Sequence, residues 1–239
     1  MYKVLEEKLQ LLNSKKPFSK NTLKSLHENL ILEWTYNSNA IEGNTLTLQE
    51  TKVVMEGITV GGKSLREHFE VINHREAIAY IEEIVRNNEP LTEWQIKNIH
   101  NLILKNIDTD NAGRYRTENV IISGAKHIPP SFLNLDEEMK SLIKWYNEDN
   151  SHPIEKSAKL HSIFVKIHPF IDGNGRTARL LLNFELMKNG YLPVVIKKEN
   201  RLDYYMALDK SHTTGDYSDF IMMIEQLEIE MIDFYLKIV

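Results

Sequence analysis

The sequence contains no cysteine, so disulfide bonds, thiolate metal sites and a cysteine nucleophile are all excluded. It also lacks an apolar run of membrane-spanning length, and its N-terminus has no long apolar stretch behind a basic start. These absences fit a reducing compartment. We therefore expect a soluble, cytoplasmic protein that does not bind a membrane.

Positive charge is not in excess, because 29 Lys and Arg face 34 Asp and Glu and the net charge is -5. Nucleic-acid-binding proteins depend on a basic surface, so we expect no nucleic acid partner. The 239 residues, 42% of them hydrophobic, suffice for a sizeable core. The length predicts one domain, or one domain with a helical extension.

Most of the chain has the apolar spacing of amphipathic helices. In the last segment, from Phe220 to Ile238, apolar residues recur every three or four positions. Similar stripes lie within residues 5–12, 23–34, 71–85 and 135–146, with Pro- and Gly-containing turns between them. The pattern predicts an all-α protein.

One stretch, residues 111–130, loses the helical period. Val120, Ile121 and Ile122 are β-branched, residues 123–125 can turn, and residues 126–128 can return as a second short strand. This pattern predicts a small β-hairpin, with a surface loop as the alternative. An isolated hairpin is marginally stable unless it packs on helices or gains a partner strand.

The most informative segment runs from His168 to Arg179 and reads HPFIDGNGRTAR. Pro169 disfavours helical backbone at His168, so the apolar helix before it should end there. Gly173 and Gly175 open the next apolar helix. Such a turn directs several backbone N–H groups and the positive end of the helix dipole at one point, which makes an anion site.

Charged side chains in the same segment fit this anion site. Arg176 and Arg179 are three residues apart and share a helix face, and His168 is a candidate general base. Asp172 is a candidate ligand for a Mg²⁺ ion that bridges phosphate oxygens. Each feature alone is more often structural, but their joint occurrence predicts a polyphosphate site. A zinc site that includes His161 is an alternative without the usual His-Glu-x-x-His spacing.

The twelve residues resemble the motif of the Fic family, His-Pro-Phe-x-Asp/Glu-Gly-Asn-Gly-Arg-x-x-Arg, at every defined position. The likeness extends from about Trp34 to about Gln226. It implies an all-α, Fic-type helical bundle with the hairpin as a flap, ATP with Mg²⁺, and AMP transfer (AMPylation) to a Ser, Thr or Tyr of a target protein. The division we expect is an N-terminal helical extension over residues 1–60 and a Fic catalytic domain over residues 61–239.

The resemblance also implies roles for individual residues. His168 would deprotonate the target hydroxyl, and Asp172 would bind Mg²⁺. The implied ATP-binding residues are Gly173, Asn174, Gly175, Arg176 on the α- and β-phosphates, Arg179 on the γ-phosphate, and Tyr204, Tyr205 and His212 near the adenosine. One Fic-family member of the class with an inhibitory motif has an Asn at the position of His212. The detailed adenine contacts therefore stay open.

The segment before residue 131 looks like the family flap, which holds a target segment by strand pairing. Gly113-Arg114-Tyr115-Arg116 and then Val120, Ile121 and Ile122 carry this likeness. Peptide capture at a strand edge agrees with the predicted hairpin. A target protein is therefore the expected partner, and a homodimer is left open.

A second motif, Ser38-Asn39-Ala40-Ile41-Glu42-Gly43-Asn44, resembles the inhibitory pattern Ser/Thr-x-x-x-Glu-Gly/Asn of one Fic class. Gly43 is a natural helix terminator, which leaves Glu42 at the negative end of a helix dipole. A carboxylate is unfavourable there unless an arginine meets it, and the resemblance supplies Arg179. Ser38, Glu42 and Gly43 are thus the implied inhibitory residues.

Several functions compete with autoinhibited AMP transfer. Glu42 could activate a water that removes AMP from a modified target (de-AMPylation). The related Doc branch transfers phosphoryl groups instead, but the second arginine and the Gly-Asn-Gly turn disfavour that reaction here. A non-catalytic, nucleotide-sensing adaptor would need no base at His168.

Overall fold

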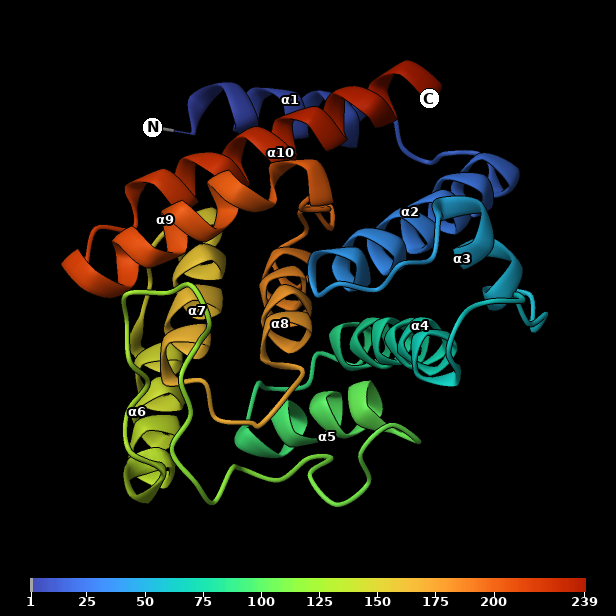
Figure 1. Ribbon diagram of the computed structural model, residues 1–239. Helices are drawn as coiled ribbons and strands as arrows, with labels where there is room; N and C mark the ends of the chain where they lie inside the picture. Colours follow the sequence, from blue (N-terminus) through green and yellow to red (C-terminus); the bar gives the residue numbers. More distant parts are fainter. Residues whose placement is uncertain (1) are drawn as a thin grey trace.

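The computed structural model describes residues 2–239, and the regular structure within them is entirely helical (Figure 1). The α-helices are α1 (Lys3–Ser14), α2 (Lys20–Ile41), α3 (Leu48–Met55), α4 (Leu65–Arg86), α5 (Glu93–Leu104), α6 (Leu135–Glu148), α7 (Pro153–Ile167), α8 (Asn174–Lys188), α9 (Arg201–Thr214) and α10 (Ser218–Ile238). Short 3₁₀ turns, η1 (Phe132–Asn134) and η2 (Lys198–Asn200), precede α6 and α9. The all-α prediction is confirmed.

Local sequence fixes where several helices begin. The Ser19 hydroxyl accepts the Thr22 N–H at the start of α2. Thr47 and Ser64 cap α3 and α4, and in both helices a Glu three residues later bonds back to the capping residue. Such reciprocal caps satisfy N–H groups that the first helical turn leaves free, and each cap stabilises its helix by about 1 kcal/mol.

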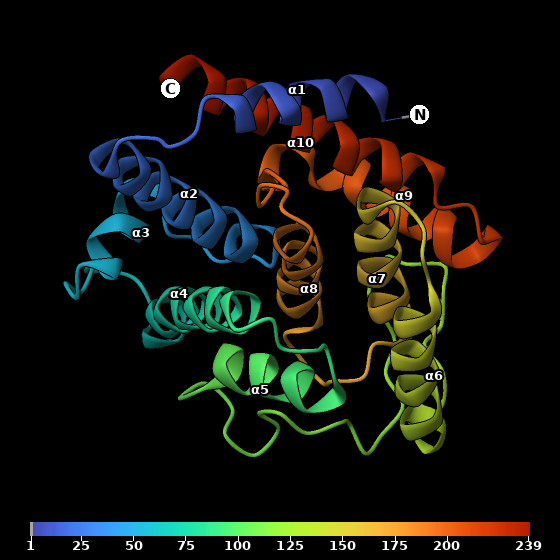
Figure 2. The ribbon, with the colours of Figure 1, turned by 180° about the vertical axis from the view of Figure 1, so that it is seen from behind.

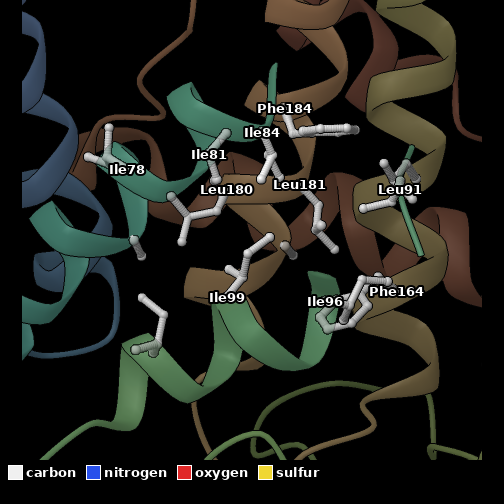
Figure 3. Close-up of a cluster of buried hydrophobic side chains, with 14 of the residues drawn as sticks. Ile78, Ile81, Ile84, Leu91, Ile96, Ile99, Phe164, Leu180, Leu181 and Phe184 are labelled. Carbon is white, nitrogen blue, oxygen red and sulfur yellow. The ribbon is translucent and has the colours of Figure 1, made fainter. Parts of the chain in front are cut away.

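Helix α8 lies in the middle of the molecule, between α7 on one side and α2 and α4 on the other (Figures 1 and 2). Its residues Leu180, Leu181 and Phe184 are fully buried and meet the apolar faces of α4, α5 and α7 (Figure 3). Burying one such side chain stabilises a protein by roughly 1.5–3 kcal/mol. The start of α8 is therefore held rigidly by the core behind it.

The first and last helices pack side by side (Figures 1 and 2). Leu5 and Leu12 of α1 are buried in a second apolar cluster that includes Ile232 of α10. An ion pair between Lys8 and Asp233 joins the two helices at the surface. Residues near the two ends of the described chain thus share one core. Within that chain no helix is long and apolar enough to cross a membrane.

The predicted β-hairpin is wrong for the described segment 111–130, which is irregular loop and turn. Ala125 N–H bonds to the Ile122 carbonyl at 3.2 Å, but this turn closes no strand ladder. Ile121 is 84% exposed and Ile128 is 72% exposed, so neither side chain packs on the helices. Without buried side chains or a third strand, the hydrogen bonds of a two-stranded hairpin do not offset its loss of chain entropy.

Other residues anchor this loop. Arg116 is 3% exposed, and its guanidinium donates to the carbonyls of Glu118 at 2.8 Å and Pro130 at 2.6 Å. Farther along, the Lys126 N–H donates to the Asp209 carboxylate of α9 at 2.9 Å. The loop is therefore fixed at its base and near its tip, while Ile121 faces solvent between them.

Candidate active site

His168 lies where α7 ends. Its backbone is left-handed, with φ 51° and ψ 59°, and its N–H still bonds to Phe164 of the last helical turn at 3.0 Å. Such a conformation is uncommon for a residue other than glycine. Here the following proline disfavours helical backbone, and the Arg116 Nε bonds the His168 carbonyl at 2.9 Å. The turn holds the imidazole at one place beside the start of α8.

Burial lowers the pKa of His168 to about 4, and the nearby Arg116 acts in the same direction. The imidazole is therefore neutral near pH 7 and has a free lone pair. A neutral imidazole at a fixed position can take a proton from a hydroxyl.

The turn between α7 and α8 is locked by its own polar groups. The Asn174 side chain donates to the Phe170 carbonyl at 2.8 Å and accepts the Phe170 N–H at 3.0 Å. Gly173 adopts φ 76°, and a Cβ there would meet His100 and Ile103 at 3.1–3.3 Å. Glycine is therefore required at this position, both for its backbone conformation and for space.

His100 of α5 supports this turn, although no motif in the sequence pointed to it. Its Nδ1 accepts the Gly113 N–H at 2.9 Å, so its Nε2 carries the proton that bonds the Asp172 carbonyl at 2.8 Å. The ring stacks on Phe170 with centroids 3.5 Å apart. Burial lowers the pKa of His100 to about 4, which keeps it in this neutral form.

The Asp172 carboxylate lies at the mouth of the turn, with its side chain 40% exposed. Its Oδ1 accepts the Gly173 N–H at 2.6 Å and lies 3.4 Å from Arg176 Nη2, while its Oδ2 pairs with Arg66. Burial alone would raise the pKa of this carboxyl, but Arg176, the Gly173 N–H and Arg66 together hold it below its ordinary value. Asp172 is therefore ionised.

Both arginines of the motif are buried, with Arg176 at 2% and Arg179 at 4% exposure. Arg176 points to Asp172 and to Glu70 of α4, whose Oε1 lies 3.4 Å from Nη1. Buried charges of this kind are stable only when they are paired.

Arg179 points to the end of α2. Its Nε donates to the Ser38 hydroxyl at 3.0 Å, and its Nη2 donates to the Ser38 carbonyl and to Glu42 Oε1, each at 2.7 Å. The pairing of Glu42 with Arg179 that the resemblance implied is thus present. Gly43, with φ 99°, directly follows Glu42 at the end of α2.

Glu42 also lies on the backbone of α8. A Cβ added at Gly175 would collide with Glu42 Oε1, so this carboxylate is in contact with the first turn of the helix. A helix N-terminus is where free N–H groups and the positive dipole attract an anion. The Glu42 carboxylate therefore lies where this helix start favours a negative charge.

Of the three residues expected near the adenosine, Tyr204 and Tyr205 lie together, with ring centroids 5.4 Å apart. Tyr204 is buried, and its hydroxyl bonds His161 at 2.9 Å and Arg179 at 3.4 Å. Tyr205 is 44% exposed beside the end of α2. His212 bonds the Ser162 carbonyl at 3.0 Å and faces His127 of the loop.

The zinc alternative finds no support in this geometry. His161 is fully buried and bonds Tyr204 rather than turning toward His168. In residues 2–239, no group of three or more His, Asp or Glu is placed to hold a metal.

The fold and the site together define a class of helical proteins that gather a histidine, a carboxylate and two arginines around a glycine-rich helix start. Residues 90–186 match the family model described as "Fic/DOC family". The chain belongs to this family.

Similar proteins extend the match beyond those residues. "Protein adenylyltransferase Fic" from Nematostella vectensis is 41% identical over 206 residues, which are 84% of this chain and 48% of that protein. The chain thus spans about half the length of the curated relatives it matches. A Fic-domain-containing signaling protein from Bacteroides thetaiotaomicron has a TM-score of 0.89 at 32% identity, covering 99% of this chain and 95% of that one. Fic-1 from C. elegans has a TM-score of 0.86 at 30% identity, covering 97% and 72%.

Proposed function

We propose that this protein transfers AMP from ATP to a Ser, Thr or Tyr hydroxyl of a target protein. The observation that carries the proposal is the placement of neutral His168, ionised Asp172 and two arginines around the N-terminus of α8. The relatives named as protein adenylyltransferases support it. As in the sequence prediction, residues 61–239 would supply the catalytic domain, and residues 1–60 would supply its regulatory extension.

The geometry suggests how the chain's own groups act. The N–H groups at the start of α8 and the Arg176 guanidinium would hold the phosphates. His168 would take the proton as the target oxygen bonds to the α-phosphorus and the bond to the β-phosphate oxygen breaks. Pyrophosphate would then leave, with its charge facing Arg176 and the helix start.

Asp172 fits a magnesium ion. It is ionised, and its Oδ1 is held by the Gly173 N–H beside the start of α8. Magnesium in such sites is bound by one or two carboxylates together with substrate phosphates and water. Asp172 would hold the ion, which would neutralise charge on the phosphates.

The same contacts support autoinhibition by Glu42. Its carboxylate engages the Arg179 guanidinium and lies against Gly175, so it competes with the γ-phosphate for both. Ser38 would keep Arg179 turned toward α2. Removal of AMP is a second candidate, because this carboxylate lies where it could activate a water beside a bound phosphate.

Labelled ATP tests the reaction class. Relative to the extract alone, we expect an extract incubated with the enzyme to gain protein-bound label from α-labelled ATP and no additional label from γ-labelled ATP. An enzyme-dependent gain of label from the γ position would instead show phosphoryl transfer. Absence of label with either nucleotide, for both the wild type and a Glu42 variant, would favour the nucleotide-sensing adaptor.

The loop from Val120 to Ile122 is proposed to hold the target segment by backbone hydrogen bonds. Ile121→Pro would remove one N–H donor from an exposed position, so the target KM should rise about tenfold while ATP affinity stays unchanged. Steady-state kinetics with target and ATP varied separately measure both. Ile121→Val is the matched control, because it keeps the donor. Equal loss in both parameters, or no loss in either, would contradict this role.

A further inference from the structure

Arg66 contacts the carboxylate proposed to hold the metal, although it is 106 residues from Asp172 in the sequence. Its Nη2 pairs with Asp172 Oδ2, and its Nε bonds Glu70 Oε1 at 3.2 Å. Oδ1 of Asp172 is already bonded to the Gly173 N–H at 2.6 Å. Arg66 therefore covers the oxygen that faces outward and that an incoming cation would use.

We propose that Arg66 is a built-in competitor of the divalent cation. In the metal-free protein its guanidinium neutralises Asp172, and it has to move away before a metal ion can bind there. Arg66 thereby sets how tightly the site binds metal. The inference rests on the proposed role of Asp172 as a metal ligand.

The two arginines beside Asp172 differ in a way that supports release of one of them. Arg176 is 2% exposed and is held in the core, whereas the Arg66 side chain is 56% exposed. An exposed ion pair contributes little to stability, because water screens the charges and the long side chain loses freedom. Arg66 can therefore leave at little cost, while Arg176 stays for the phosphates.

Glu70 gives Arg66 a second position. Its side chain is 12% exposed. It bonds Arg66, lies 3.4 Å from Arg176 Nη1 as an ion pair, and through Oε2 accepts from the Asn44 amide at 2.9 Å. Arg66 can keep its Nε contact with Glu70 while its Nη2 releases Asp172. The Arg66 guanidinium would thus rotate about its contact with Glu70. Glu70 itself stays in place and keeps its bond to Asn44 in the loop after Glu42.

Metal binding itself tests the proposal, independently of catalysis. The nucleotide-free protein is titrated with Mn²⁺, and the electron paramagnetic resonance signal of free Mn²⁺ gives the Kd. Arg66→Gln should lower this Kd by up to about fivefold, the factor that corresponds to an exposed ion pair of about 1 kcal/mol.

Arg75→Gln is the matched control. Arg75 is an exposed arginine of the same helix, but it bonds the Met55 carbonyl. Its replacement removes the same charge from α4, so an unchanged Kd separates local competition from a general field effect. An Arg66→Gln protein with unchanged or weaker Mn²⁺ binding, or an equal effect of both variants, would overturn the proposal.

Asp172→Asn distinguishes failure of the competition by Arg66 from failure of the metal role of Asp172. If this variant loses Mn²⁺ binding while Arg66→Gln behaves as wild type, only the competition is wrong. If Asp172→Asn binds Mn²⁺ as the wild type does, the metal role of Asp172 in the proposed function fails as well.

Discussion

His168→Ala is expected to lower the rate of AMP transfer by roughly 10²–10⁴-fold while ATP affinity changes little, because a general base acts on the barrier and hardly on ground-state binding. Burial and Arg116 keep the imidazole neutral, so it is ready to accept a proton. Single-turnover transfer to one target measures the rate, and calorimetric titration with a non-hydrolysable ATP analogue measures the affinity.

The pH dependence gives a second readout for the same residue. With a pKa of about 4, His168 stays unprotonated as the pH falls from about 8 to about 6. Transfer should therefore not decline across the range in which an ordinary histidine gains its proton. A decline with an apparent pKa near 6.5 that belongs to His168 would contradict the assigned state.

A surface histidine provides the control. His27 bonds Glu82 at 2.7 Å on the exposed faces of α2 and α4, so His27→Ala should leave the rate unchanged. The folding of both variants is checked by thermal unfolding. Near-normal transfer by a folded His168→Ala protein would remove the general-base mechanism.

Glu42→Gly is expected to raise AMP transfer and self-modification by about 5–150-fold, the range of ordinary switching energies of about 1–3 kcal/mol. The Glu42 carboxylate accepts a hydrogen bond from Arg179 Nη2 at 2.7 Å and lies against Gly175. Its removal therefore frees the guanidinium and the start of α8 together. ATP can then place its α-phosphate in line for attack. Rates on one target, before and after the change, measure the effect.

The reverse reaction should respond in the opposite sense. If Glu42 activates the water that removes AMP, Glu42→Gly abolishes removal while it raises transfer. Glu42→Gln tests whether charge or bulk matters, because it keeps the shape and loses the negative charge. Arg179→Ala is the control and should not activate, since it deletes the phosphate ligand together with the partner of Glu42. Unchanged or lower transfer in a folded Glu42→Gly protein would refute the inhibition.

Local pattern predicted much of this fold. The apolar stripes gave the helices now seen as α1, α2, α4, α6 and α10. The proline after His168 predicted the end of α7. These features depend on backbone preferences and periodicity within a few residues, which a single sequence carries directly.

What the sequence missed depends on distant packing. Val120 to Ile122 suggested a strand, but strand formation needs a partner and a buried face, and the loop has neither. The contacts of Arg66 and His100 with Asp172 bridge 106 and 72 residues, and no local period encodes them. Family resemblance did point to Glu42 and Arg179, because it carries information about such distant pairs.

The pairing of α1 with α10 has a consequence for the order of events during synthesis. Lys8 meets Asp233 across 225 residues, and Glu42 meets Arg179 across 137. Chains are made from the N-terminus at about 5–20 residues per second, so α1 waits roughly 10–45 seconds for its partner helix. Over that interval α1 lacks the helix with which it makes most of its contacts. Helix α1 is thus made long before the helix it packs against.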